Sequence, residues 1–158
     1  MRKIQTGVAA LAVGASVFMA IAANAQGETK LISRMNGAKE VSSEGQKGVG
    51  DPDGRGRATI RLQRSAGRVC FNLSWENIGA PGAAHIHDGG ADEAGPVVVT
   101  LFASDNPLPG TISGVRGCAS DVDQAVITAI KNDPAGHYVN VHNGEYPGGA
   151  IRGQLRKP

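Results

Sequence analysis

The amino-acid sequence predicts an all-β domain, an immunoglobulin-like or Greek-key β-sandwich of about eight strands with one short helix. Three observations support this prediction. Short apolar runs recur along the chain, and clusters of Gly, Pro, Asn and Asp separate them. Glycine is abundant, with 23 residues, whereas aromatic residues make up only 4% of the chain. One segment alone has the apolar spacing of a helix. These patterns together are typical of sandwiches and barrels with many turns.

Residues 1–25 are predicted to be a secretory signal peptide. Arg2 and Lys3 precede an uncharged apolar stretch that ends in the small-x-small pattern Ala23-Asn24-Ala25. The alternative is an uncleaved anchor, but the apolar run is short for a membrane span of about 20 residues. Cleavage would leave residues 26–158, which suits one domain. We therefore expect a secreted or periplasmic protein with no membrane span after signal cleavage.

Four strands are predicted in the first half of the domain: Lys30–Met35, Arg57–Gln63, Arg68–Trp75 and Ala83–His87. The second of these alternates clearly, with Ala58, Ile60 and Leu62 on one face. Turn residues fill the segment 45–56 that precedes it. A short Ser-Ala-Gly turn follows it, so the second and third strands should form a hairpin.

Four more strands and the helix are predicted in the second half. Pro96–Phe102 is almost continuously apolar, so we expect a central strand that is covered on both faces. Apolar residues at helical spacing indicate a helix over Asp121–Asn132, with Asp121 able to cap its start. The remaining strands are Thr111–Cys118, His137–His142 and Ala150–Leu155. Phe71, Trp75 and Phe102 should be the bulky members of the core.

The overall charge gives no reason to expect a polyanionic partner. The whole chain has 16 basic and 14 acidic residues, but Arg2 and Lys3 leave with the signal peptide, so the mature chain is balanced. Because a balanced chain exerts no general attraction, we predict no nucleic-acid binding and no attraction to anionic lipid.

The two cysteines are expected to form one disulfide. Cys70 and Cys118 are an even count in a chain predicted to enter an oxidising compartment. In the chain-entropy model, closing the loop between them would stabilise the folded state by roughly 4 kcal/mol. Cys70 has the parity of Asn72 and Ser74 on its strand, so the bridge should lie outside the core. Two separate thiols are the alternative.

Several segments together resemble the CHRD domain, a module named from chordin and found alone in many secreted bacterial proteins. The matching segments follow one another in order and span nearly all of the mature chain: MNGAKEV (35–41), DPDGRGRATIRL (51–62), AAHIHDGG (83–90), GPVVVTL (95–101) and HYVNVHNGEYPGGAIRGQL (137–155). The resemblance identifies residues 26–158 as a CHRD domain and implies an immunoglobulin-like sandwich. It implies little about chemistry, because a fold hosts many functions.

Strand geometry suggests a cluster of histidines. Successive side chains of a strand alternate between faces, so His85 and His87 share one face and Ile86 takes the other. By the same rule, His142 lies opposite the face of Val139 and Val141 on its own strand. If the two strands are neighbours with their aliphatic residues inward, three imidazoles meet on one outer face. His137 has the other parity and is left out.

Three imidazoles in one place are a plausible site for copper or zinc, and we predict His85, His87 and His142 as the ligands. Neutral imidazole suits both ions, and three histidines with an open fourth position are a known zinc arrangement. Asp88, Asp92 and Asn140 are candidates to orient the imidazole N–H groups. The alternative is that the histidines brace the sheet through hydrogen bonds and bind no metal.

Three functions remain open at this point. The first is a binding or interaction module with an unidentified protein or envelope partner and a transition metal. The second is a copper-dependent redox enzyme, because His-x-His on a strand of a sandwich is similar to the copper half of copper–zinc superoxide dismutases. No second ligand cluster for a structural zinc is evident. The third is a purely structural envelope protein. No nucleophile motif is present, so no catalytic residue is predicted.

Arg152 is the other charged residue whose place can be predicted. Because Ile151 should point into the core, we expect Arg152 to point outward and to pair with Glu145 or Asp88. The acidic residues around Asp51 and Asp53 lack the spacing of a calcium loop, and we interpret them as a turn.

Overall fold

Residues 27–158 are described by the structure, a computed structural model. The predicted signal peptide lies outside these residues. Eight strands form one antiparallel sheet in the order β5-β4-β7-β8-β1-β2-β3-β6. Their bounds are β1 Thr29–Asn36, β2 Arg55–Gln63, β3 Arg68–Glu76, β4 Pro81–Asp88, β5 Val97–Ala103, β6 Gly114–Ala119, β7 His137–Asn143 and β8 Ile151–Gln154. One α-helix, α1, spans Gln124–Asn132. The predicted all-β class is therefore confirmed.

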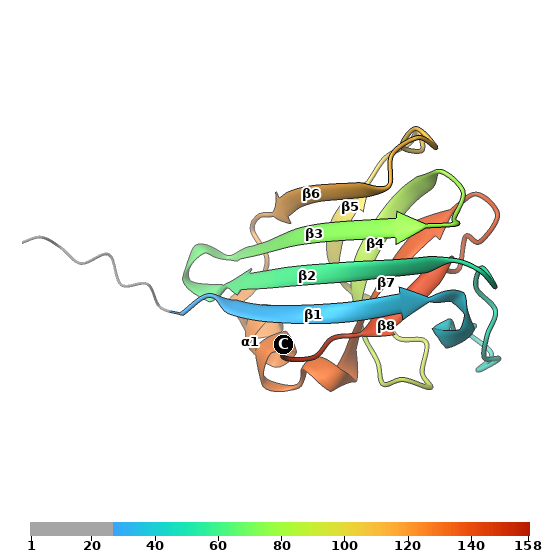
Figure 1. The fold of residues 1–158 in the computed structure, drawn as a ribbon. Coiled ribbons are helices and arrows are strands. Elements are labelled where there is room, and N and C mark those ends of the chain that lie inside the picture. Colours follow the sequence, from blue (N-terminus) through green and yellow to red (C-terminus); the bar gives the residue numbers. More distant parts are fainter. Residues whose placement is uncertain (1–26) are drawn as a thin grey trace, which may run out of the picture.

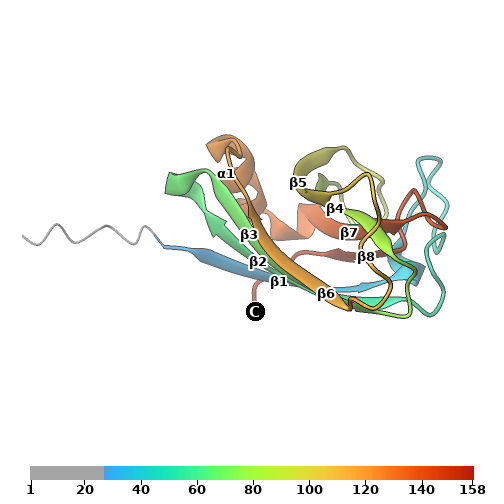
Figure 2. The same ribbon diagram turned by 90° about the horizontal axis from the view of Figure 1, so that it is seen from above.

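The sheet folds over itself into two packed layers. β1, β2, β3 and β6 form the layer in front in Figure 1, and β4, β5 and β7 lie behind it. β8 joins the layers, because it pairs with β7 along its length and with β1 at Asn36 and Arg152. Figure 2 shows the two layers from above, with α1 at one end of the sandwich. The sheet is nearly closed. It stays open only between the edge strands β5 and β6, which are not hydrogen-bonded to each other.

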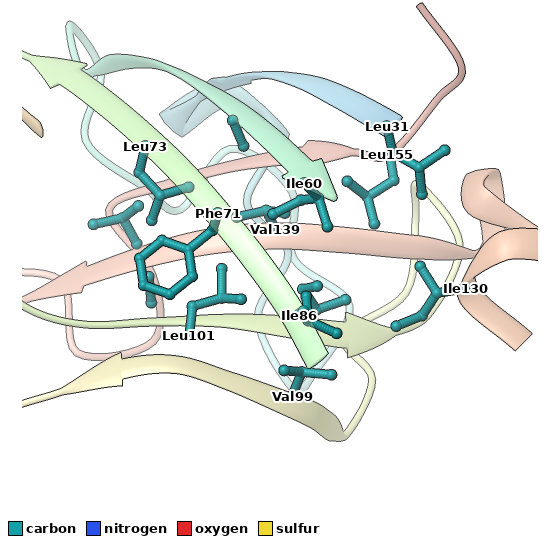
Figure 3. Packing of buried hydrophobic residues seen from close by; sticks show 14 of the residues in the cluster. Leu31, Ile60, Phe71, Leu73, Ile86, Val99, Leu101, Ile130, Val139 and Leu155 are labelled. Carbon is teal, nitrogen blue, oxygen red and sulfur yellow. The ribbon is translucent and has the colours of Figure 1, made fainter. Parts of the chain in front are cut away.

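The core lies between the two layers and is mainly aliphatic. Alternate residues of the strands supply it, as the sequence pattern predicts. Leu31, Ile60 and Leu73 come from the first layer, and Ile86 and Val139 face them from the second (Figure 3). Ile127 and Ile130 of α1 are fully buried against one end of the core. Of the three predicted aromatic members, Phe71 and Trp75 are buried, whereas Phe102 is only partly buried and packs against the core from β5.

Two details of the predicted elements are wrong. β5 is an edge strand with alternating exposure, whereas its apolar sequence predicted a central one. A continuous apolar run can occur in a strand covered on both faces or in an edge strand with one packed face. The run alone therefore could not show whether this strand is central or at the edge. The helix begins at Gln124 and its cap is Asp123, whose side chain accepts from the N–H of Ala125. Asp121 instead takes a left-handed conformation, with φ of 57°.

The predicted disulfide joins two neighbouring strands. Cys70 on β3 lies directly opposite Cys118 on β6, and the two are bonded. Neither cysteine is buried, which confirms that the bridge lies outside the core. Among the described residues, no helix has the length and apolar character needed to cross a membrane.

Candidate metal centre

Three histidines meet on the outer face of the second layer because β4 and β7 are hydrogen-bonded neighbours. In their register Ala83 is opposite His142, His85 is opposite Asn140, and His87 is opposite Tyr138. The intervening residues Ile86, Val139 and Val141 are fully buried in the core. Since side chains alternate across a strand, the three imidazoles must point away from the core.

The three rings are close enough to share one ion. Taking one nitrogen from each of His85, His87 and His142, these atoms all lie within 4.8 Å of one another. Three atoms at that spacing can all lie within about 2.8 Å of a common centre, and bonds from imidazole nitrogen to zinc are about 2.0–2.1 Å. A small inward movement would therefore suffice for coordination.

Backbone carbonyls orient two of the three rings. Nδ1 of His87 lies 2.8 Å from the carbonyl oxygen of Gly95, and Nδ1 of His142 lies 3.0 Å from that of Pro147. A carbonyl only accepts, so both Nδ1 atoms carry the proton and both Nε2 atoms carry a lone pair instead. Nε2 of His87 is buried and has no hydrogen-bond partner. Nε2 of His142 lies 3.1 Å from Nδ1 of His85, so it accepts a hydrogen bond from that N–H and its lone pair is already engaged.

All three imidazoles are held in the neutral form that a metal requires. Burial, together with the neighbouring His142 and His87, lowers the pKa of His85 to about 4. Burial also lowers the pKa of His87 and of His142, although their bonds to Gly95 and Pro147 act in the opposite direction. All three rings are therefore neutral at neutral pH, and a metal would take the place of the hydrogen bond between His85 and His142.

A buried aromatic and a buried cation form the wall beside His87. The ring of Tyr138 stacks on that of His87, with centroids 4.7 Å apart and planes 9° apart. The Cζ atom of Arg152 lies 3.4 Å from the centroid of the Tyr138 ring, which is a cation–π contact. The hydroxyl of Tyr138 accepts a hydrogen bond from the N–H of Gly95, so the loop that orients His87 is also held by this tyrosine.

The prediction for Arg152 was right about the face of the strand but wrong about the partners of the side chain. The side chain takes the outer face, as its parity predicts, but it is only 1% exposed because the loop of residues 89–95 covers it. Its guanidinium donates to the carbonyl oxygens of Gly90 and Glu93, and it forms no ion pair with Glu145 or Asp88. Nε and Nη1 of Arg152 have no partner.

A buried carboxyl lies next to this wall. Glu40 is 2% exposed, and one of its oxygens has no hydrogen-bond partner. Burial raises its pKa to about 7, while the charge of Arg152 acts in the opposite direction. A Cβ atom on Gly149 would lie 2.5 Å from the Glu40 carboxyl carbon, so only glycine fits there.

Two hollows border the cluster. His142 lines one of about 660 Å³ together with the loop of residues 104–107. His87 lines the other, of about 450 Å³, together with Glu40, Tyr138 and Tyr146. The rings of His142 and His87 therefore border open hollows, although Nε2 of His87 is itself buried.

The predicted supporting residues lie in different places. Asn140 is buried on the same face, opposite His85 in the register, and its side chain acts to raise the pKa of His87. Asp88 is exposed, 3.9 Å from Nε2 of His137, and Asp92 pairs with Lys47 at the surface. Neither acid bonds to the three histidines. His137 is buried apart from the cluster, with Nδ1 bonded to the carbonyl of Asp133.

The carbonyls of Gly95 and Pro147, the carboxyl of Glu40 and the stacked pair of Tyr138 and Arg152 were not predicted as parts of the site. Tyr138 and Arg152 have the parity of the histidines on strands next to them, which is a usable clue once the strand order is known. Backbone acceptors and a carboxyl from a distant loop leave no such pattern in the sequence.

Comparison with known proteins agrees with the resemblance seen in the sequence. The model of the CHRD domain family matches residues 31–155, which include the three histidines, Tyr138 and Arg152. No curated protein and no solved structure matches the chain.

Proposed function

The chain belongs to the CHRD domain family, and on this basis we propose that it is a secreted binding module that holds a copper or zinc ion at His85, His87 and His142. A role as a binding module is what membership of the family suggests. The metal is the more specific part of the proposal and rests on the histidine cluster.

The arrangement of proton donors and lone pairs carries the metal proposal. Bracing hydrogen bonds account for Nδ1 of all three rings and for Nε2 of His142, but not for Nε2 of His87. Here Nε2 of His87 is buried without a partner, and burial of an unsatisfied polar atom costs about 1–3 kcal/mol. A metal ion at the meeting point of the three nitrogens would remove that cost. The carbonyls of Gly95 and Pro147 already select the tautomer that coordinates.

The donor set fits copper and zinc better than harder ions. All three ligands are neutral nitrogens, and no described carboxylate joins them, so Mg²⁺ and Ca²⁺ would lack the oxygens they prefer. When bound, copper would supply one-electron chemistry, or zinc would supply Lewis acidity. Around either ion the chain's own part is to orient the rings, exclude water on the side of Arg152 and keep the ligands deprotonated.

Secretion is part of the proposal. The disulfide between Cys70 and Cys118 is compatible with an oxidising compartment outside the cytoplasm. The predicted signal peptide over residues 1–25 points to the same place.

Metal content and spectroscopy test the proposal. Purified protein is stripped with chelator, loaded with Cu²⁺ or Zn²⁺ and desalted, and the bound metal is counted. We expect one ion per chain, with the electron paramagnetic resonance spectrum of the copper form showing coupling to imidazole nitrogens. The His85→Ala, His87→Ala double variant should retain none.

The same preparation separates the rival functions. If the copper form accelerates superoxide decay and the double variant does not, the module is a redox enzyme. Stoichiometric metal without turnover would support a binding or carrier role. A protein that keeps no metal after desalting, while its fold is intact by circular dichroism, would leave the structural role of the histidines as the explanation.

A further inference from the structure

The outward surface of the first layer is strongly basic, and we infer that it binds an anionic polysaccharide through repeating carboxylate or sulfate groups. This surface is the one turned toward the viewer in Figure 1, on the strands β1, β2, β3 and β6. It lies on the opposite side of the core from the histidine cluster. The inference therefore does not rest on the metal proposal.

Alternate residues of neighbouring strands place the charges on this surface. We call basic face the outward positions occupied by Lys30, Arg34, Arg55, Arg57, Arg61 and Arg116, all of which are exposed. Glu76 is the one acidic residue at the outward positions of these strands. The acids that balance the chain lie elsewhere, many of them in loops. A net charge near zero therefore hides a charged face that sequence composition could not predict.

The arrangement of these cations costs stability. Arg34 is directly opposite Arg57 in the register of β1 and β2, and Lys30 is directly opposite Arg61. Like charges facing each other across strands are destabilising. Arg61 is compensated by an ion pair with Glu28 of 2.7 Å. Across residues 27–158, Arg34, Arg57 and Arg116 have no side-chain hydrogen bond or ion pair, so their charges are available to a partner.

Two hollows follow one another along the basic face. The first, of about 660 Å³, is lined by the basic residues Arg34, Lys39, Arg55 and Arg57, by Ser74 and Ser113, and by the acidic residue Glu76. The second, of about 370 Å³, is lined by Arg61 and Arg116 together with Thr59 and Asn72. Arg57 and Thr59 are successive outward residues of β2, so the hollows form one track. Both charged and uncharged polar side chains line it.

This combination fits a polysaccharide better than the other common polyanions. Arginine pairs with carboxylate and sulfate groups through two parallel hydrogen bonds, and five of the six cations are arginine. The aromatic residues Phe71 and Trp75 of the layer are buried, so nucleic-acid bases would find no stacking platform. The exposed large apolar residues Val49, Val97 and Ile112 lie outside the basic face. This face therefore offers no large apolar side chain that could insert into a membrane.

Binding to immobilised polymers tests the inference. Purified protein is passed in chelator, which removes any contribution of metal, over polygalacturonate, dextran sulfate and neutral dextran, and over duplex DNA and phosphatidylglycerol vesicles. We expect retention on polygalacturonate, dextran sulfate or both, none on neutral dextran, and weaker binding at about 0.15 M salt than at low salt. The first two polymers distinguish carboxylate from sulfate recognition.

Matched variants show whether binding depends on the arrangement of the basic face or only on the total charge of the protein. The Arg34→Gln, Arg57→Gln double variant should bind at least about tenfold more weakly. The control is Arg64→Gln, Lys131→Gln, which removes the same charge from positions near α1 and should change binding less than about twofold. Arg34→Lys, Arg57→Lys keeps the charge but loses the paired hydrogen bonds, so its loss should be intermediate.

Three results would overturn the inference. They are no retention on either anionic polysaccharide at low salt, an equal loss in the control variant, and tighter binding to DNA or to the vesicles than to the polysaccharides. Folding of the variants is checked by thermal unfolding. The Arg34→Gln, Arg57→Gln variant should unfold no lower than the wild type, because it relieves repulsion between facing charges.

Discussion

The ring of Tyr138 lies parallel to the ring of His87, with centroids 4.7 Å apart, and its hydroxyl accepts a hydrogen bond from the N–H of Gly95. The carbonyl of the same Gly95 lies 2.8 Å from Nδ1 of His87. One tyrosine thus fixes the plane of a candidate ligand and the loop that sets its tautomer. Arg152 holds the tyrosine in turn through its cation–π contact.

Two substitutions at Tyr138 should separate the stack from the hydroxyl. Tyr138→Leu removes the stacking surface, and we expect copper affinity to fall about tenfold or more, as is usual when a group that orients a ligand is lost. Tyr138→Phe keeps the stack and loses one hydrogen bond, so affinity should fall by less than about threefold. Isothermal titration of both variants measures this. Equal losses would show that stacking does not orient His87.

The close approach of Gly149 to Glu40 predicts a stability difference between adjacent glycines. Gly149 has φ of 141°, and a Cβ there would meet the Glu40 carboxyl, whereas a Cβ on Gly148 would meet nothing within 4 Å. Gly149→Ala should therefore cost about 2–4 kcal/mol of unfolding free energy, and Gly148→Ala less than about 1 kcal/mol. Urea denaturation compares them. Similar values for the two variants would mean that the buried carboxyl is not packed as described.

The lowered pKa values of the histidines predict that the metal-free protein loses stability in acid. Between about pH 6.5 and pH 4 the unfolded chain takes up a proton at His85, whereas the folded chain does not. The unfolded state then binds more protons, so the unfolding free energy must fall as the pH drops through this window. Urea denaturation at pH 7 and pH 5 measures the fall. It should be smaller in His85→Gln, and an identical fall would contradict the assignment.

The raised pKa of Glu40 predicts the opposite dependence of the unfolding free energy on pH. Its pKa is raised to about 7 from 4.5, so between these values the folded state keeps a proton that the unfolded state has released. Its contribution to stability is therefore present in acid and is lost as the pH rises toward 7. Glu40→Gln removes this loss, so the stability of the variant relative to the wild type should increase from pH 5 to pH 8. The urea midpoints across that range test this, and a constant difference would contradict it.

Much of the fold follows from alternation in the sequence, but the neighbours of each strand do not. Period-two patterns place Ile60 inward and Arg57 outward, and they place His85 and His87 on one face. That the strand of His142 lies beside them was an assumption at the level of sequence, and the pairing of β4 with β7 bears it out. The edge position of β5 was missed because an apolar run does not reveal its neighbours.

The environment of the candidate site could not be predicted for a related reason. The alternation of side chains along the strand placed Arg152 on an outer face, and this suggested that its side chain is exposed to solvent. The fold instead lays residues 89–95 over it, and this loop also supplies the carbonyl that orients His87. Glu40 reaches the site from a segment far away in the chain. Such tertiary contacts between loops have no period and no fixed spacing, so no local pattern announces them.

Copper titration of the His142→Ala variant tests the central claim most directly, because this residue alone brings a ligand from a second strand. Isothermal titration of metal-free wild type should give one site for Cu²⁺, with weaker binding of Zn²⁺. His142→Ala should lower copper affinity by at least about a hundredfold, while His137→Gln, which alters a histidine outside the cluster, should bind as the wild type does. Unchanged copper affinity in His142→Ala, or no heat from the wild type, would contradict a metal centre on this face.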